Sequence, residues 1–523
     1  MKHIKLICAA LAASLSIGAM QSCADLDPLD YSEINPSNFP KTEADIESLV
    51  QSCYYPLRPN WWDGIFTPSE RGVMYLNESL TGVLSSTWGI PKDGAEMNYY
   101  PEYDGITFFY YTRSAPNGYA NKVSRCTLVL DDIEKSALDE NAKNRYAAEV
   151  RCARGFLSYL LYDMFGPIVV APLDVLQNPL EEKSLPRLSR AEMVKFIEDD
   201  LTFAAEHLPM PGKAEYGKFS SGLAKMLLIR LYLHETADYN YPEGHTQGSK
   251  DYFNKVETLA RELKQPEYGY ALQPSYPKMF EQGGQGSANK EIIWALPCSY
   301  EGPDINQWHC MVLPTDFDQN GMGAGWGCAT STWKFYDSFE PGDTRRTYLL
   351  TSYHSSNTDG EIDRDSPSSP LARGPIPMKI GYDAGVKGNG NASNIDLIIF
   401  RYADVYLSLA EALCEKPGAT TADMKEAVDN VNAIRGRAGL GGLKYADYTD
   451  PDKLRDAILM ERWHEFWCEN GQFRADLIRY HKLVDWVKWL TDSPYAAEYK
   501  ELYPLPLSVI SDGKGQVVQN PGY

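Results

Sequence analysis

Apolar residues recur at three- and four-residue steps through both ends of the chain, and this periodicity limits the fold more than any other feature. The clearest run occupies positions i, i+3, i+4, i+7, i+8 and i+11 with Tyr402, Val405, Tyr406, Leu409, Ala410 and Leu413. A helix with about 3.6 residues per turn places all of these side chains on one face. The chain is therefore predicted to be mainly α-helical.

The helical pattern divides into consecutive segments. It covers residues 120–135, 146–161, 190–208, 220–235, 251–264, 402–413, 421–437 and 452–468. Thr42 and Ser189 are predicted to cap helices, and Pro451 precedes another. The turn Lys416-Pro417-Gly418 joins two helices into a unit of about the tetratricopeptide size, although the consensus residues of that repeat are not evident. We expect a tetratricopeptide-like scaffold of helical pairs.

The middle of the chain has a different character. Glycine, proline and serine gather in residues 283–286, 321–327 and 366–370, and the short apolar run 292–296 is typical of a strand. We predict a helical scaffold over 40–265 and 398–523, interrupted by a loop-rich, partly β insertion over about 266–397. Residues 54–118, rich in Tyr, Trp, Gly and Pro, are also expected to form loops.

The N-terminus resembles an export signal. Two lysines, an apolar stretch and small residues precede Cys23, so residues 1–22 are predicted to be a lipoprotein signal peptide and Cys23 the acylated first residue of the mature chain. The alternative is an ordinary secretory signal followed by a coincidental cysteine. No later apolar run reaches the roughly 18 residues of a membrane helix, so the expected anchor is lipid.

Charge and cysteine spacing exclude several classes of protein. The net charge of −21 argues against nucleic acid or anionic lipid as the main partner. The ten cysteines contain no CxxC pair, which argues against a zinc site. In an oxidising compartment, the sequence is compatible with a disulfide bridge among Cys298, Cys310 and Cys328.

Four stretches and the C-terminus resemble one known family in their amino-acid residues and in their order along the chain. They are Glu149–Leu157 continuing to Met164-Phe165-Gly166-Pro167, Phe400–Leu407 with Ala410-Glu411-Ala412, Asn432–Leu440, Ile458–Phe466 with Gly471, Arg474 and Asp476-Leu477, and Gln519–Tyr523. In this order they are similar to the SusD/RagB family of outer-membrane nutrient-binding lipoproteins, and with the signal they span nearly the whole chain. One departure is Asn470, which stands where the family has the glutamate of a Glu-Gly pair.

The resemblance implies a function. It implies a lipid-anchored protein at the cell surface of the outer membrane, which captures an oligosaccharide or polysaccharide for import through a partner SusC-like TonB-dependent transporter. It also implies a binding protein with no enzymatic activity. We expect the charged residues of these stretches to form structural ion pairs, because charges on apolar helices are normally paired. They are Arg401, Glu411, Arg435, Arg437, Glu461 and Arg474.

The family's ligand loops vary, so ligand-binding residues must be predicted from chemistry. Aromatic rings cover the C–H faces of a sugar, while polar side chains bond its hydroxyls. Aromatics in Gly- and Asn-rich loops fit this need: Trp61, Trp62, Trp88, Tyr99, Tyr100, Trp308 and Trp326. Burial of these rings as loop anchors is the alternative. Trp463, Trp467, Trp486 and Trp489 fall in helical stretches and are predicted to lie in the core.

Catalytic and metal motifs are poorly represented. His234-Glu235 and His464-Glu465 each lack the second histidine of HExxH, and no GxSxG is present. We expect no cofactor. A structural calcium ion at Asp316, Asp318 and Asn320 stays open, although the twelfth position of that loop is Gly327 rather than glutamate.

Two other functions remain as alternatives. A protein of the same family could capture peptides or glycopeptides instead, and an acidic groove would favour basic peptides. A remote alternative is an all-helical glycosidase, because acidic residues abound but no carboxylate pair stands out. The sequence does not identify the glycan, its linkage or its length.

Overall fold

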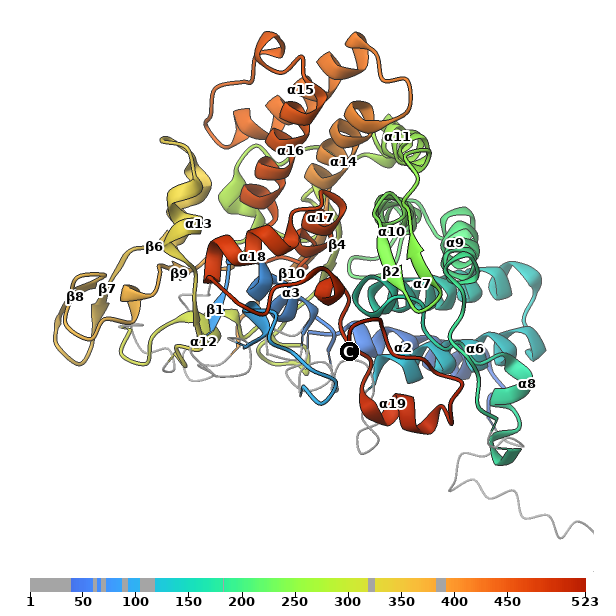
Figure 1. Cartoon of the computed structure of the whole chain (residues 1–523). Helices are drawn as coiled ribbons and strands as arrows, with labels where there is room; N and C mark the ends of the chain where they lie inside the picture. The colour runs from blue at the N-terminus through green and yellow to red at the C-terminus, as the bar shows by residue number, and fades with distance from the viewer. Residues whose placement is uncertain are drawn as a thin grey trace, which may run out of the picture.

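The computed structural model describes residues 39–59, 64–66, 72–86, 93–103, 118–181, 183–317, 325–381 and 392–523. Within these ranges, long helices occupy both ends of the sequence, and short helices, strands and loops lie between them (Figure 1). The predicted fold class, a mainly α-helical scaffold with a loop-rich and partly β region, is confirmed.

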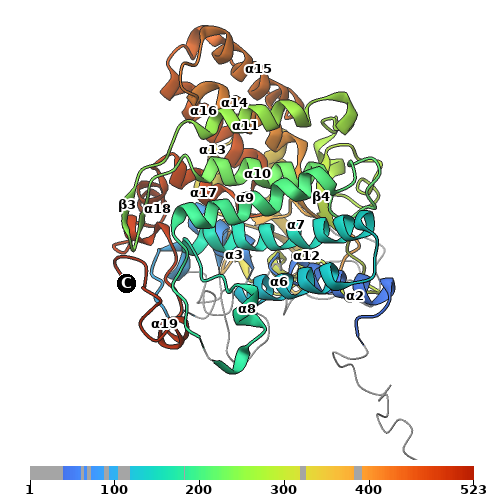
Figure 2. The same cartoon turned by 90° about the vertical axis from the view of Figure 1, so that its right-hand side faces the viewer.

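The helical scaffold is a stack in which each helix packs on the next. Its N-terminal part comprises α2 (Glu43–Tyr54), α6 (Tyr119–Lys135), α7 (Glu140–Phe165), α9 (Arg190–His207), α10 (Ser221–His234) and α11 (Tyr252–Leu263). Its C-terminal part comprises α14 (Tyr402–Glu415), α15 (Thr421–Arg437) and α16 (Pro451–Phe466). Figure 2 shows the succession from α2 and α6 at the bottom, through α7, α9, α10 and α11, to α14 and α15 at the top.

Local capping fixes where several helices begin. The side chain of Thr42, Ser189 or Thr420 accepts a hydrogen bond from the amide three residues ahead, and the carboxylate there accepts one from the cap residue's own amide. The predicted caps at Thr42 and Ser189 are confirmed. Pro451 occupies the first turn of α16. Proline favours this position because an N–H there would have no partner within the helix.

One helix lies where loops were predicted. Helix α3 (Val73–Thr81) falls within residues 54–118, and all nine of its residues are buried. It packs against α17 (Phe473–Arg479) and α18 (Leu483–Thr491). Its nine residues mix apolar side chains with the buried polar residues Asn77, Glu78, Ser79 and Thr81, and they lie in a stretch whose Gly and Pro content favours loops.

Strands of the described chain pair only in two-stranded ladders. The longest joins β4 (Ile292–Leu296), where the sequence predicted a strand, to β10 (Leu397–Arg401) in antiparallel register. Because β10 runs directly into α14, this ladder ties the loop-rich region to the scaffold. The other ladders pair β1 (Ser85–Ser86) with β5 (Ala329–Thr330), β2 (Tyr239–Tyr241) with β3 (Gly244–Thr246), β6 (Leu349–Leu350) with β9 (Ile376–Pro377), and β7 (Ser352–Ser355) with β8 (Gly360–Asp363).

Short helices complete the described chain. They are α8 (Leu173–Leu176), α12 (Trp308–Val312), α13 (Trp333–Ser338), α19 (Leu507–Asp512) and 3-10 turns such as Tyr55–Leu57 and Glu498–Glu501. The C-terminal tail closes the end of α7, because the Asn520 side-chain amide donates to the carbonyl oxygens of Phe165 (3.0 Å) and Tyr503 (2.7 Å).

All eight cysteines of the described residues are buried free thiols. The suggested disulfide bridge among Cys298, Cys310 and Cys328 is therefore not formed in this structure. Helices in the described ranges are too short or too polar to cross a membrane.

Candidate functional site

Four of the predicted ligand-binding aromatics lie in the described part of the chain: Tyr99, Tyr100, Trp308 and Trp326. Several other predictions lie outside the described residues, namely the aromatics Trp61, Trp62 and Trp88, the calcium candidates Asp318 and Asn320, and the lipidation site Cys23.

The predictions for Trp308 and Tyr99 are wrong. Trp308 has 0% of its surface exposed, and its indole N–H donates to the carbonyl oxygen of Pro377 at 2.9 Å. The Asn306 carboxamide oxygen accepts from the Trp308 amide at 2.9 Å, which turns the chain inward at this point. Tyr99 is also buried, and its hydroxyl donates to the carbonyl oxygen of Lys500. Neither ring has a face that a sugar could cover.

Tyr100, by contrast, is 55% exposed. Its ring meets Tyr103 edge-on, with 6.3 Å between the ring centroids. Among the four predicted aromatic residues that the structure describes, Tyr100 has the largest exposed fraction.

Trp326 is half-buried on a segment whose backbone is tightly held. Its amide donates to the carbonyl oxygen of Cys310 at 2.6 Å, and the amide of Gly327 donates to that of Leu313 at 2.8 Å. A Cβ at Gly325 would collide with the Leu313 carbonyl oxygen, and Gly327 has φ +57°, so both glycines are needed for this path. The segment then enters β5, so the backbone that carries Trp326 is held on both sides of this residue.

The β1–β5 ladder joins this segment to a second predicted loop. Ser86 pairs with Ala329, three residues after Trp326. Ser86 is also the last described residue before 87–92, the stretch that contains Trp88. Two of the predicted aromatic segments therefore connect to one short ladder.

Asp316 already has hydrogen-bonding partners within the protein. Its carboxylate accepts hydrogen bonds from the hydroxyls of Tyr353 (2.9 Å) and Ser355 (2.5 Å), which attach it to the hairpin β7–β8. In the described ranges, no group of three or more His, Cys, Asp or Glu side chains is arranged to hold a metal ion. The described residue of the suggested calcium site thus has a structural role.

Several exposed aromatic residues lie outside the predicted ligand-binding set. Trp489, predicted to lie in the core, is 46% exposed, and Tyr495 and Tyr499 after it are also exposed. Leu483 and Val487 form the buried side of α18, and the helical period turns Trp489 away from them. That spacing was the available signal. Trp486 is half-buried, whereas Trp463 and Trp467 lie in the core as predicted.

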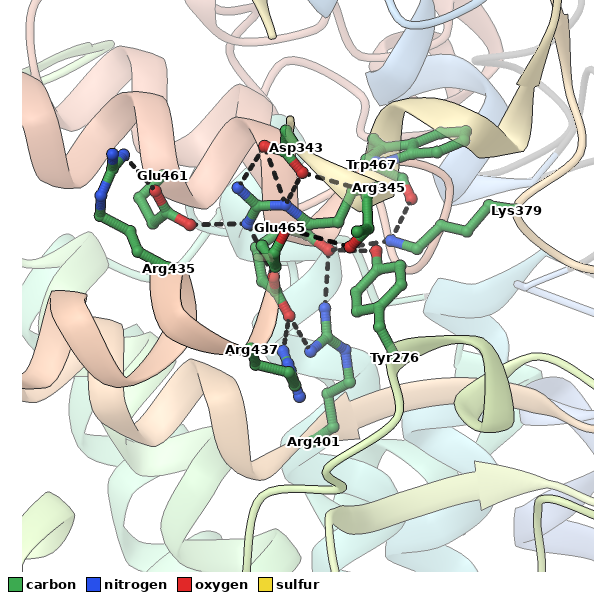
Figure 3. Close-up of polar contacts among 12 residues, drawn as sticks. Tyr276, Asp343, Arg345, Lys379, Arg401, Arg435, Arg437, Glu461, Glu465 and Trp467 are labelled. Atoms are coloured by element: carbon green, nitrogen blue, oxygen red, sulfur yellow. Dashed lines mark hydrogen bonds and ion pairs between the residues drawn. The ribbon is translucent and has the colours of Figure 1, made fainter. Parts of the chain in front are cut away.

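The charged residues predicted to form structural ion pairs are all paired, and Figure 3 shows four of them, Arg401, Arg435, Arg437 and Glu461. Arg401 contacts Glu291 (3.0 Å), Glu465 and Glu469 (2.8 Å), and its side chain has no exposed surface. The other pairs are Arg437 with Glu291 and Glu465, Arg435 with Glu340 and Glu461, Glu461 with Arg345, Arg474 with Asp163, and Glu411 with Arg479.

Electrostatics support a structural role for this cluster. Burial opposes ionisation of Glu465, but Arg437, Arg401 and Arg345 outweigh it and hold the pKa of this carboxyl well below its usual range. Burial lowers the pKa of Lys379 to about 8, although Glu469 opposes that shift. The Lys379 ammonium donates to the carbonyl oxygens of Glu465 (2.9 Å) and Trp467 (2.7 Å). With both signs of charge matched and solvent excluded, the cluster binds the insertion to α15 and α16.

Comparison with known proteins places the chain among relatives of one kind. The profile of the SusD family matches residues 374–523. SusD-like protein P2 of Formosa agariphila is 26% identical and aligns over 96% of this chain and 97% of its own. The starch-binding protein SusD of Bacteroides thetaiotaomicron is 22% identical over 77% of this chain and 76% of its own.

Solved structures share the whole fold. The crystal structure of a SusD superfamily protein from Bacteroides vulgatus superposes with a TM-score of 0.74 at 19% sequence identity, covering 93% of this chain and all of that one. This likeness extends across the helical stack and the loop-rich region, well beyond residues 374–523.

Proposed function

We propose that this chain, which matches the SusD family profile over residues 374–523 and aligns with a SusD-like protein over 96% of its length, is a cell-surface lipoprotein. In this proposal it binds an oligosaccharide or polysaccharide and passes it to a SusC-like TonB-dependent transporter. In this proposal the protein is not an enzyme. Cys23 carries the lipid anchor, and the outer membrane is the site of action.

The observation that carries the proposal is Trp326, a half-buried ring on a rigid loop in a chain related to a starch-binding protein. A neutral sugar exchanges hydrogen bonds with water for hydrogen bonds with protein at little net gain. Apolar stacking therefore supplies much of the affinity, and an aromatic ring loses little conformational entropy when it is already fixed. The two glycines and the amide contacts of residues 326 and 327 hold the backbone that carries the Trp326 ring.

Trp326→Ala tests this role. We expect a ten- to hundredfold loss of affinity, which corresponds to about 1–3 kcal/mol, for the polysaccharide that wild type binds best. The measurement is isothermal titration calorimetry, with thermal melting to verify folding.

Trp486→Ala is the matched control. Trp486 is also half-buried, but its indole N–H donates to the Thr81 carbonyl oxygen at 3.0 Å and its ring meets Trp463 edge-on at 4.6 Å. This variant should bind glycan like wild type. Unchanged affinity in a folded Trp326→Ala protein would refute the role of Trp326 as a sugar platform.

A further inference from the structure

A cavity lined by tyrosines lies between the end of α2, the loop 211–219 and the end of β4. It has a volume of about 320 Å³, and its walls include Tyr54, Tyr55, Arg58, Tyr216, Lys218 and Asp304. We call it the tyrosine cavity. It is separate from the segment that carries Trp326, and none of its wall residues belongs to the aromatic set predicted from the sequence.

The tyrosine walls are held in place from outside the cavity. The Tyr54 hydroxyl donates to Glu149 at 2.7 Å, and the Tyr216 hydroxyl donates to Asp396 at 2.8 Å. Phe219 stacks on the Tyr54 ring, with 4.1 Å between the centroids. Burial, followed by Glu149, raises the pKa of Tyr54 well above its ordinary value, so its hydroxyl remains a neutral donor.

Cations gather at the same rings. The Lys218 ammonium lies over Tyr54, 4.7 Å from the ring centroid. The Arg58 guanidinium and the Lys122 ammonium lie over Tyr55, at 5.4 and 6.0 Å. The charged side chains on the cavity wall are Arg58, Lys218 and Asp304, which sum to one positive charge in a chain whose net charge is −21.

Lys218 differs from Arg58 in having no carboxylate partner among the residues that the structure describes. Arg58 pairs with Asp304 at 2.5 Å. Across the described part of the chain, no acidic side chain lies within ion-pair distance of Lys218, whose ammonium contacts the Tyr54 ring instead. Acidic residues outnumber basic ones by 71 to 50, so a half-buried lysine on a cavity wall without a carboxylate partner is conspicuous.

We propose that the tyrosine cavity binds an anionic sugar unit, with its carboxylate or sulfate at Lys218 and its ring against the tyrosines. A charge-assisted hydrogen bond to a partly desolvated ammonium is stronger than a neutral one and is screened less by salt than a fully exposed pair. A net charge of −21 disfavours anionic ligands over the molecule as a whole, so an anionic unit needs a local cation such as Lys218. The inference rests on the proposed function, because it names the class of glycan unit that one part of the protein recognises.

A second cavity beside the tyrosine cavity provides room for a longer oligosaccharide. Tyr216, Gly217, Lys218 and Trp294 also line a second cavity of about 340 Å³, whose far wall includes Tyr268 and Tyr270. Lys218 thus stands on the wall that the two cavities share. An oligosaccharide could place its anionic unit at Lys218 and extend to either side.

Lys218→Ala tests the proposal, and Lys213→Ala is its matched control. Lys213 belongs to the same loop and is exposed, but it lines neither cavity. The probes are oligogalacturonate for carboxylate, chondroitin sulfate oligosaccharides for sulfate, and a neutral glucan. Affinities are measured by calorimetry at low and high salt, with melting temperatures as the check on folding.

We expect Lys218→Ala to lose about tenfold in affinity for an acidic probe and nothing for a neutral glucan, while Lys213→Ala matches wild type. Wild-type affinity for the acidic probe should also fall as salt rises. The acidic probe that binds more tightly identifies carboxylate or sulfate. Equal affinity of Lys218→Ala and wild type for acidic probes would overturn the inference.

The two proposals fail in different ways. A wild-type protein that binds neutral glycans but neither acidic probe refutes the anionic site and leaves the proposed function standing. A wild-type protein that binds no glycan refutes both. Equal losses for acidic and neutral probes in Lys218→Ala would show that this lysine supports folding rather than charge recognition.

Discussion

Glu78 is a carboxyl group inside the molecule with few groups to stabilise its charge. Its oxygens accept hydrogen bonds from the Thr81 hydroxyl (3.1 Å) and the Cys468 amide (3.2 Å). Burial raises its pKa from 4.5 to about 8, although Thr81 and the nearby Lys379 oppose the shift. The folded protein therefore holds a proton at Glu78 that the unfolded chain releases.

This proton makes stability depend on pH. Between about pH 4.5 and pH 8, the folded state binds more protons at Glu78 than the unfolded state does. The contribution of Glu78 to the free energy of unfolding should therefore fall as pH rises through this window, by at most about 1.4 kcal/mol per pH unit. Urea titrations of wild type and Glu78→Gln at several pH values measure it, and the variant should show a flatter profile.

The control for this prediction is Glu47→Gln, because Glu47 is exposed on α2. That variant should keep the wild-type slope. Parallel profiles for wild type and Glu78→Gln would mean that Glu78 is ionised in the folded protein.

At the scale of elements, the junction between the insertion and the scaffold is electrostatic as well as apolar. Arg401, the last residue of β10, pairs with three carboxylates. Glu291 directly precedes β4, Glu465 lies in the last turn of α16, and Glu469 follows that helix. Arg345 reaches the same helix from the insertion through Glu461 (2.6 Å) and Glu465 (2.9 Å). Removing one cation leaves buried anions without a partner.

Arg401→Ala should lower the free energy of unfolding by about 3–5 kcal/mol, measured by urea denaturation. Arg145→Ala is the comparison, because its pair with Glu43 is more than half exposed on both sides and such pairs contribute at most about 1 kcal/mol. Glycan affinity of the folded Arg401→Ala protein should match wild type. Weakened binding with an unchanged melting point would instead place Arg401 in the ligand site.

Long helices with periodic sequences were predictable, and a short helix inside a loop-like stretch was not. The caps at Thr42 and Ser189 and the periodic face of α14 carry local signals that survive in the fold. Helix α3 has only nine residues and lies in a stretch rich in Tyr, Trp, Gly and Pro, which predicted loops. Trp308 shows the limit at a single position, because burial depends on which tertiary surface covers a ring, and loop composition does not encode that surface. The exposure of Trp489, in contrast, follows from its position on α18 relative to Leu483 and Val487.

The whole molecule is proposed to be anchored at the cell surface through a lipid on Cys23. Cys23→Ala should release the protein from the outer-membrane fraction, because a lipoprotein without its acyl chains has no other predicted anchor. Cell fractionation with immunoblotting measures this, and export itself should continue. Unchanged co-fractionation of the variant with the outer membrane would contradict lipidation at Cys23.

The claim that joins these scales is that the folded chain binds glycan. Affinity electrophoresis of the purified wild-type protein through gels that contain neutral and acidic polysaccharides, one in each gel, tests it most directly, with serum albumin as the non-binding standard. The account predicts that at least one polysaccharide retards the protein and that the free oligosaccharide restores its mobility. Unretarded migration in every gel, together with saturable binding of a basic peptide in solution, would contradict it.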